Sequence, residues 1–307
     1  MLINKAILIL IFSVLLYSLI AIFTDFSKFV ENLQNLNLMF LPLIIFIMIL
    51  SLCVKSIRQD YLLKKLNIRI PFKNNLKIFI AGLSMLVTPG GSGELVKSHI
   101  LKEKFDEPIS KTIPVIFLER FHDFLGILGV LVLTAFFIFS SHVFLAIIGS
   151  SVILSLISVI IIQKNFLKWI QQKLVKIKFL EKLFMQDDQF YASLFTLFKP
   201  KPILISFLIS FVGIILDGFA IYLSIISIIP EIQFFEAVQK GFTAVIVGLF
   251  SLLPAGIGVT EVSLLGLLAN NEISESRAAS AVIYLRLTTL WFMTGLGFIF
   301  LKIMYKK

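Results

Sequence analysis

Long apolar runs separated by short polar stretches dominate this chain. Such runs occupy about 6–23, 38–54, 110–139, 143–162, 202–229 and 277–301. Each can cross a bilayer as a helix, which takes about 20 mostly apolar residues. Two more apolar stretches, 75–104 and 235–270, are interrupted by proline and glycine. The pattern predicts an all-α polytopic membrane protein with about six full spans, two broken segments and a short polar loop after residue 23.

Both broken segments share one sequence feature, a Pro-x-Gly-x-Gly break followed closely by a glutamate. A helix broken at membrane depth is tolerated only where its backbone is buried in protein or lines a wet cavity. A carboxylate beside such a break is a functional-site candidate. We therefore expect the two breaks to form the centre of the protein. The residues are Pro89, Gly90, Gly91, Ser92, Gly93 and Glu94 in the first copy, and Pro254, Gly256, Gly258 and Glu261 in the second.

The halves of each broken segment are too short to cross a bilayer, so we predict re-entrant hairpins that enter and leave on one side. Nearly all lysines and arginines outside the membrane then fall on the same side, including those of the basic surface segment 163–201. The exceptions are Lys28, Lys240 and Arg277. This asymmetry predicts a multi-pass cell-membrane protein with both termini in the cytoplasm.

On this topology the two hairpins enter from opposite sides of the membrane. Each is followed by a helix that carries an arginine, Arg120 in the first copy and Arg286 in the second. We expect one membrane domain over 1–307 containing an inverted repeat, with units at about 75–139 and 235–301. Inverted repeats with broken helices are typical of alternating-access carriers.

The composition narrows the class of protein further. With 58% hydrophobic and 15% charged residues, the chain is neither disordered nor an ordinary soluble domain. Its net charge of +10 lies mainly in the loops, where topology and anionic headgroups explain it better than nucleic acid does. The single cysteine, Cys53, excludes a disulfide framework within the chain. We expect no metal and no cofactor, and no nucleotide-binding loop is present.

The helix starts after the glycine tips suit an anion, because a helix N-terminus presents free N–H groups and the positive end of the dipole. We therefore expect a phosphate cradle at Gly90–Gly93, with a partner at Gly256–Gly258. The alternative is that the glycines only allow helices to cross closely.

The two arginines, Arg120 and Arg286, also allow two interpretations of their role. Arg120 and Arg286 can each grip a phosphate with two donors. Alternatively, each forms a buried ion pair with Glu94, Glu119 or Glu261 that fixes packing. Asp123 can share a helix face with Arg120, and Glu94 and Glu261 can instead take up protons that drive transport. Secondary candidates are Lys97, His99, His122 and Asp217.

Functions from other classes stay open at this point. Gly90-Gly91-Ser92-Gly93 fits the short Gly-x-Ser-Gly string of intramembrane serine proteases, with Ser92 as the nucleophile. A lipid transferase and a non-catalytic membrane anchor for a glycosyltransferase are further alternatives. We expect a transporter rather than an enzyme.

Three motifs, at 88–94, 119–123 and 253–261, resemble the transmembrane region of lysylphosphatidylglycerol synthase/flippase proteins. The resemblance implies a membrane region that flips an anionic lipid between leaflets. Because the chain ends at Lys307, we expect a stand-alone member without a synthase domain. Its expected partners are membrane lipids, of anionic phospholipid or polyprenyl-phosphate type, and a homodimer or a separate lipid-modifying enzyme stays open. The motifs carry over Pro89, Gly90, Gly93, Glu94, Glu119, Arg120, Asp123, Pro254, Gly256, Gly258 and Glu261.

Overall fold

The computed structural model describes residues 2–88, 93–138, 141, 144–145, 147–149, 151, 187–269 and 273–306. Within these ranges the chain forms helices joined by short turns, and they contain no strand. The predicted all-α class is therefore confirmed. Pro89 to Ser92, most of the predicted span 143–162 and the basic segment up to residue 186 lie outside the described residues.

Three helices are long and apolar enough to cross a membrane. They are α3 (Phe40–Lys65), α11 (Pro200–Ile226) and the last helix, Glu275–Tyr305. A fourth is added if α1 (Leu2–Phe23) and α2 (Phe26–Gln34), which are bent by 105°, count as one span. The described residues thus bear out a membrane protein of several spans, and the number six stays a prediction.

The polar loop predicted after residue 23 is wrong, because α2 occupies this stretch. Asp25 begins the helix by accepting a 3.3 Å hydrogen bond from the backbone N–H of Lys28. Phe29 and Leu33, one turn apart, pack in a cluster with Ala279 and Ile283. The charged residues of this stretch made it look like a loop, but its apolar positions recur every four residues, as in an amphipathic helix.

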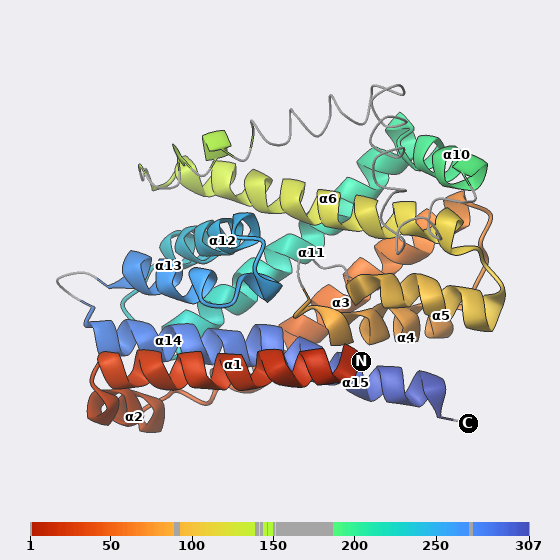
Figure 1. Cartoon of the computed structure of the whole chain (residues 1–307). Helices are drawn as coiled ribbons and strands as arrows, with labels where there is room; N and C mark the ends of the chain where they lie inside the picture. Colours follow the sequence, from red (N-terminus) through yellow and green to blue (C-terminus); the bar gives the residue numbers. More distant parts are fainter. Residues whose placement is uncertain are drawn as a thin grey trace.

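Both broken segments break where the sequence predicts. The first consists of α4 (Phe72–Gly82), the short η1 (Leu83–Met85) and α5 (Val96–Phe105), and α6 (Ile109–Ala135) follows it. The second consists of α12 (Phe234–Phe250), the short η3 (Pro254–Gly256) and α13 (Val259–Leu268). In each segment the two long halves pack against each other. Figure 1 shows α4 with α5 toward one end of the bundle and α12 with α13 toward the other.

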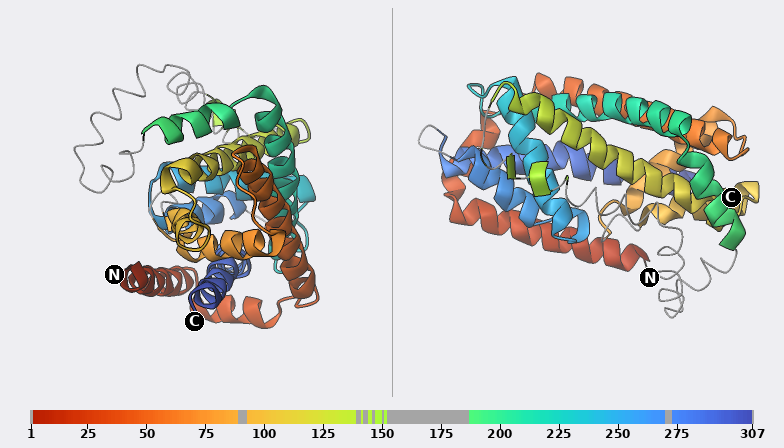
Figure 2. Two further views of the ribbon diagram at one scale, coloured as in Figure 1. Left: turned by 90° about the vertical axis from the view of Figure 1, so that its right-hand side faces the viewer. Right: turned by 90° about the horizontal axis from the view of Figure 1, so that it is seen from above.

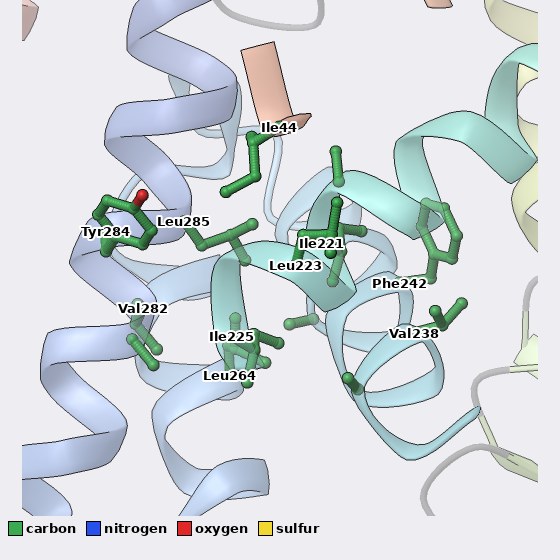
Figure 3. Packing of buried hydrophobic residues seen from close by; sticks show 14 of the residues in the cluster. Ile44, Ile221, Leu223, Ile225, Val238, Phe242, Leu264, Val282, Tyr284 and Leu285 are labelled. Atoms are coloured by element: carbon green, nitrogen blue, oxygen red, sulfur yellow. The ribbon is translucent and has the colours of Figure 1, made fainter. Parts of the chain in front are cut away.

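A hydrophobic core joins these elements. α3 packs along α11, which also contacts α6, α12 and α14 (Glu275–Arg286). Figure 3 shows Ile221 of α11 and Phe242 of α12, with Leu264 of α13 and Leu285 of α14 in the same cluster. α1 lies at the edge of the bundle beside α14 (Figure 2). α10 (Asp187–Leu197) packs mainly on α6.

The last helix contacts both broken segments. Its first part, α14 (Glu275–Arg286), packs on α13, and its second part, α15 (Phe292–Tyr305), packs on α4 and η1. A wider π-helical turn, Leu287–Trp291, joins the two parts directly after Arg286. Turns of this kind are rare and frequently mark functional sites.

Candidate functional site

A cavity of about 230 Å³ lies between the two broken segments. Residues of α3, α4, α6, α11, α12, α13 and the last helix line it, and most of them are apolar. Five charged side chains interrupt this apolar lining. They are Lys55, Arg120, Asp217, Glu261 and Arg286.

At the second tip, Glu261 and Arg286 form the expected buried ion pair. Arg286 Nε lies 2.7 Å from Glu261 Oε1, and Arg286 Nη2 donates to the carbonyl oxygen of Ala255 at 3.1 Å. The carboxylate also accepts a 3.2 Å bond from the Tyr17 hydroxyl of α1. Arg286 thereby ties the broken tip to α14.

At the helix start of this tip, the amide of Gly258 is bonded within the protein. The N–H of Gly258 donates to Glu261 Oε2 at 2.7 Å, so the glutamate caps its own helix. Within the expected partner cradle at Gly256–Gly258, the Gly258 amide is therefore engaged by an internal carboxylate.

At the first tip, Glu94 pairs with two cations. Arg120 Nη2 lies 3.2 Å from Glu94 Oε1 and 3.1 Å from Asp123 Oδ2. Lys97 Nζ lies 3.0 Å from Glu94 Oε2 and 2.5 Å from Glu119 Oε2. The Arg120 side chain is 40% exposed and lines the cavity, whereas the side chain of Glu94 is 1% exposed. Arg120 is thus the cation of this tip that a ligand in the cavity can reach.

Glycines at both tips permit close packing. A Cβ on Gly93 would overlap Met85, and the Gly93 amide donates to Thr88 Oγ1 at 2.6 Å. Gly256 has a φ of +64°, and a Cβ there would lie 2.9 Å from the Cα of Gly248. The surroundings of Gly93 and Gly256 agree with the alternative that the glycines allow close packing. Pro254 begins the short helix η3.

A second charged cluster, which the sequence reasoning missed, joins α3 to α11. Lys55 lies 2.5 Å from Asp217, and Ser51 donates to the same carboxylate at 2.6 Å. Deeper in the bundle, Arg58 is fully buried and pairs with Asp123. Ser210 bridges this pair, since Arg58 Nη1 donates to its hydroxyl at 2.5 Å and the hydroxyl donates to Asp123 at 2.8 Å.

A signal for this cluster was present in the sequence. Ser206, Ser210, Gly213 and Asp217 recur at spacings of three and four, so they form one polar stripe along α11. Lys55 and Arg58 follow the apolar run 38–54 and were counted among the charges outside the membrane, but α3 continues to Lys65 and carries both into the bundle.

The remaining candidates lie apart from the cavity. Glu119 is fully buried behind Lys97. His122 is buried, with Nδ1 3.1 Å from the Ser206 hydroxyl. His99 is exposed, and neither histidine lines the cavity. Among the described residues there is no group of three or more His, Cys, Asp or Glu side chains that could hold a metal ion.

The fold and site define a membrane protein in which two broken helices meet at a cavity with buried ion pairs. A family model for the lysylphosphatidylglycerol synthase TM region matches residues 7–297, so the chain belongs to this family. It is also similar to UPF0104 membrane proteins. One from Pyrococcus horikoshii is 25% identical, with 95% of each chain covered. One from Methanocaldococcus jannaschii is 26% identical over 72% of this chain and 94% of its own, and a second from that organism is 23% identical over 99% and 96%.

Proposed function

We propose that this protein translocates an anionic, phosphate-bearing lipid across the cell membrane. The observation that carries the proposal is the placing of Arg120 and Arg286, one behind each broken tip, on the wall of a single, mostly apolar cavity. A phosphate needs charge-assisted donors, which guanidinium groups supply in pairs. The apolar wall suits the first carbons of the lipid tails, which would stay in the bilayer.

The two arginines differ in how firmly the protein holds them. Arg286 is 10% exposed at its side chain and bonds to both Glu261 and the Ala255 carbonyl. Arg120 is 40% exposed and keeps its two carboxylates at 3.1 and 3.2 Å, longer than most charge-assisted bonds. Arg120 is therefore the group that can exchange an internal carboxylate for a lipid phosphate, while Arg286 anchors its tip.

The arrangement of the tips supports alternating access. The two broken segments lie toward opposite ends of the bundle (Figure 1), and residues of both line one cavity. With both inserted as re-entrant hairpins in an inverted repeat, among about six full spans, rocking of one against the other would open the cavity to each leaflet in turn. The distribution of lysine and arginine then places both termini in the cytoplasm.

A lipid-flipping assay in vesicles tests the proposal. The purified protein is reconstituted with fluorescent phosphatidylglycerol, polyprenyl phosphate or, as a zwitterionic control, phosphatidylcholine. A membrane-impermeant quencher then reports how fast label leaves the inner leaflet. We expect at least one of the two anionic probes to move faster than in protein-free vesicles, and faster than phosphatidylcholine. If neither does, the proposal is wrong.

Variants connect the assay to the site. Arg120→Ala is expected to slow flipping about tenfold or more, because one charge-assisted pair is worth about 1.5–3 kcal/mol. Lys28→Ala is the matched control, since that cation is paired with Asp25 on the surface and its side chain is 68% exposed. Ser92→Ala separates a carrier from a serine hydrolase, because only the hydrolase needs that hydroxyl.

A further inference from the structure

The buried charges around the cavity balance in number. Five cations are linked by ion pairs to five carboxylates among the described residues. The cations are Lys55, Arg58, Lys97, Arg120 and Arg286, and the carboxylates are Glu94, Glu119, Asp123, Asp217 and Glu261. Without a ligand, this part of the protein is therefore electrically neutral.

A phosphate that enters this neutral cluster brings a negative charge that nothing compensates. An unpaired charge in a low-dielectric interior is so costly that a titratable neighbour is usually neutralised instead. A carboxylate that takes up a proton restores the balance. The carboxylate that its own partners hold least firmly is the one most readily protonated.

Three of the five carboxylates are well satisfied. Asp123 accepts bonds from Arg58 and Ser210, and Asp217 accepts them from Lys55 and Ser51. Glu261 accepts from Arg286, Tyr17 and its own helix start. A carboxylate that accepts several hydrogen bonds is stabilised as the anion.

Glu94 and Glu119 are held differently, because they share one lysine. Lys97 Nζ lies between them, 3.0 Å from Glu94 and 2.5 Å from Glu119. Glu119 Oε1 is buried and has no hydrogen-bond partner among the described residues. Once a phosphate draws Arg120 away, Glu94 loses its second cation. Two carboxylates with side chains no more than 1% exposed then face a single positive charge.

The surroundings of the pair supply no replacement cation among the described residues. The side chain of Lys97 faces α4, where its Nζ lies over the ring of Phe79, 5.1 Å from the ring centroid, and its methylene carbons pack on Gly82. On α6, Asp123 adds a like charge. On α3 and α11, Arg58 and Lys55 are bound to Asp123 and Asp217. On α6, His122 is buried, with Nδ1 3.1 Å from the Ser206 hydroxyl on α11.

We infer that binding of the anionic headgroup is coupled to the uptake of one proton by the Glu94–Glu119 pair. The proton comes from water and bonds to a carboxylate oxygen, and no electron is transferred. A singly charged phosphodiester and this proton then cross together, so the net charge that crosses is zero. Rising pH on the side where the lipid binds therefore weakens binding, by up to about tenfold per pH unit for one proton. This coupling rests on the proposed function, and it makes the carrier a lipid-anion/proton symporter.

The first test needs no ligand. In Arg120→Gln the cation is lost permanently, so one of the two carboxylates is expected to be protonated at neutral pH. Infrared spectroscopy detects this as the C=O stretch of a carboxylic acid, and we expect the wild-type cluster to show no such band without a ligand. The band is expected to disappear in the Arg120→Gln, Glu119→Gln double variant. An Arg120→Gln protein that folds but shows no such band overturns the coupling.

The second test uses short-chain phosphatidylglycerol and calorimetry in buffers of different ionisation enthalpy. We expect about one proton taken up per lipid bound in the wild type, and no uptake in Glu119→Gln. Binding without proton uptake overturns the coupling and leaves the proposed function intact. If neither this lipid nor a short-chain polyprenyl phosphate binds, the proposed function falls and the coupling falls with it.

Discussion

Arg286 and Glu261 are 25 residues apart in sequence and form a 2.7 Å ion pair that ties a broken tip to the last helix. The side chain of Glu261 is fully buried, and that of Arg286 is 10% exposed. Arg120 and Glu94 repeat the relationship at the other tip, at 3.2 Å. Each broken segment is therefore joined to a following helix by one arginine.

Arg286→Ala is expected to destabilise the protein by about 3–5 kcal/mol, because it leaves Glu261 buried without its cation. Unfolding in mixed micelles measures this. Arg277→Ala is the matched control, since its pair with Glu231 is partly exposed and is expected to contribute less than about 1 kcal/mol. Adding Glu261→Gln to Arg286→Ala should recover part of the loss. An equal loss in Arg286→Ala and Arg277→Ala would contradict the buried pair.

Arg58→Ala is expected to be among the most damaging single changes in α3. Its side chain is fully buried against Asp123 and Ser210, so its removal takes from Asp123 the cation that is fully buried and leaves the partly exposed Arg120, at a cost of about 3–5 kcal/mol. Lys65→Ala in the same helix is exposed and is expected to change stability by about 0.5 kcal/mol or less. Thermal unfolding of the two variants side by side checks this. Similar melting temperatures would place Arg58 in the solvent-facing basic stretch instead.

Gly256→Ala is expected to cost about 1–3 kcal/mol. The substitution places a Cβ at a positive φ and 2.9 Å from the backbone of Gly248. Gly266→Ala, on α13 of the same broken segment, meets nothing within 4 Å and is expected to stabilise by roughly 0.5–1 kcal/mol, because alanine favours the helix. Opposite signs in unfolding experiments support the close crossing of α12 and the tip. A neutral Gly256→Ala would count against it.

Tyr17→Phe tests whether α1 is held to the site by a polar contact. The Tyr17 hydroxyl donates to Glu261 at 3.2 Å and accepts from Trp291 Nε1 at 3.1 Å. Its removal is expected to cost about 1 kcal/mol and, because α1 is then held less firmly, to speed lipid flipping. Tyr305→Phe, at a side chain that is half exposed, serves as the control. A loss of flipping as large as that of Arg120→Ala would instead make Tyr17 a binding group.

The sequence predicted the helical class, both breaks and the acidic and basic residues beside them, because prolines, glycines and isolated charges stand out in apolar runs. It offered ion pairs with Glu94, Glu119 or Glu261 as one of two interpretations of Arg120 and Arg286, but it did not predict the partners of Lys55, Arg58 and Lys97. Lys97 was a secondary candidate although it joins Glu94 to Glu119. Lys55 and Arg58 were counted among the charges outside the membrane, because the apolar run of this span ends at residue 54. Only the packing of α3 on α11 and on α6 brings Asp217 to Lys55 and Asp123 to Arg58.

The π-helical turn at Leu287–Trp291 has a mechanical consequence. One continuous helix touches both broken segments, α13 through its first part and α4 with η1 through its second. If the angle between those two segments changes while both keep their contacts, this helix must bend. The π-helical turn begins directly after Arg286. A bend of the helix at this turn would therefore move the guanidinium group of Arg286 relative to α15.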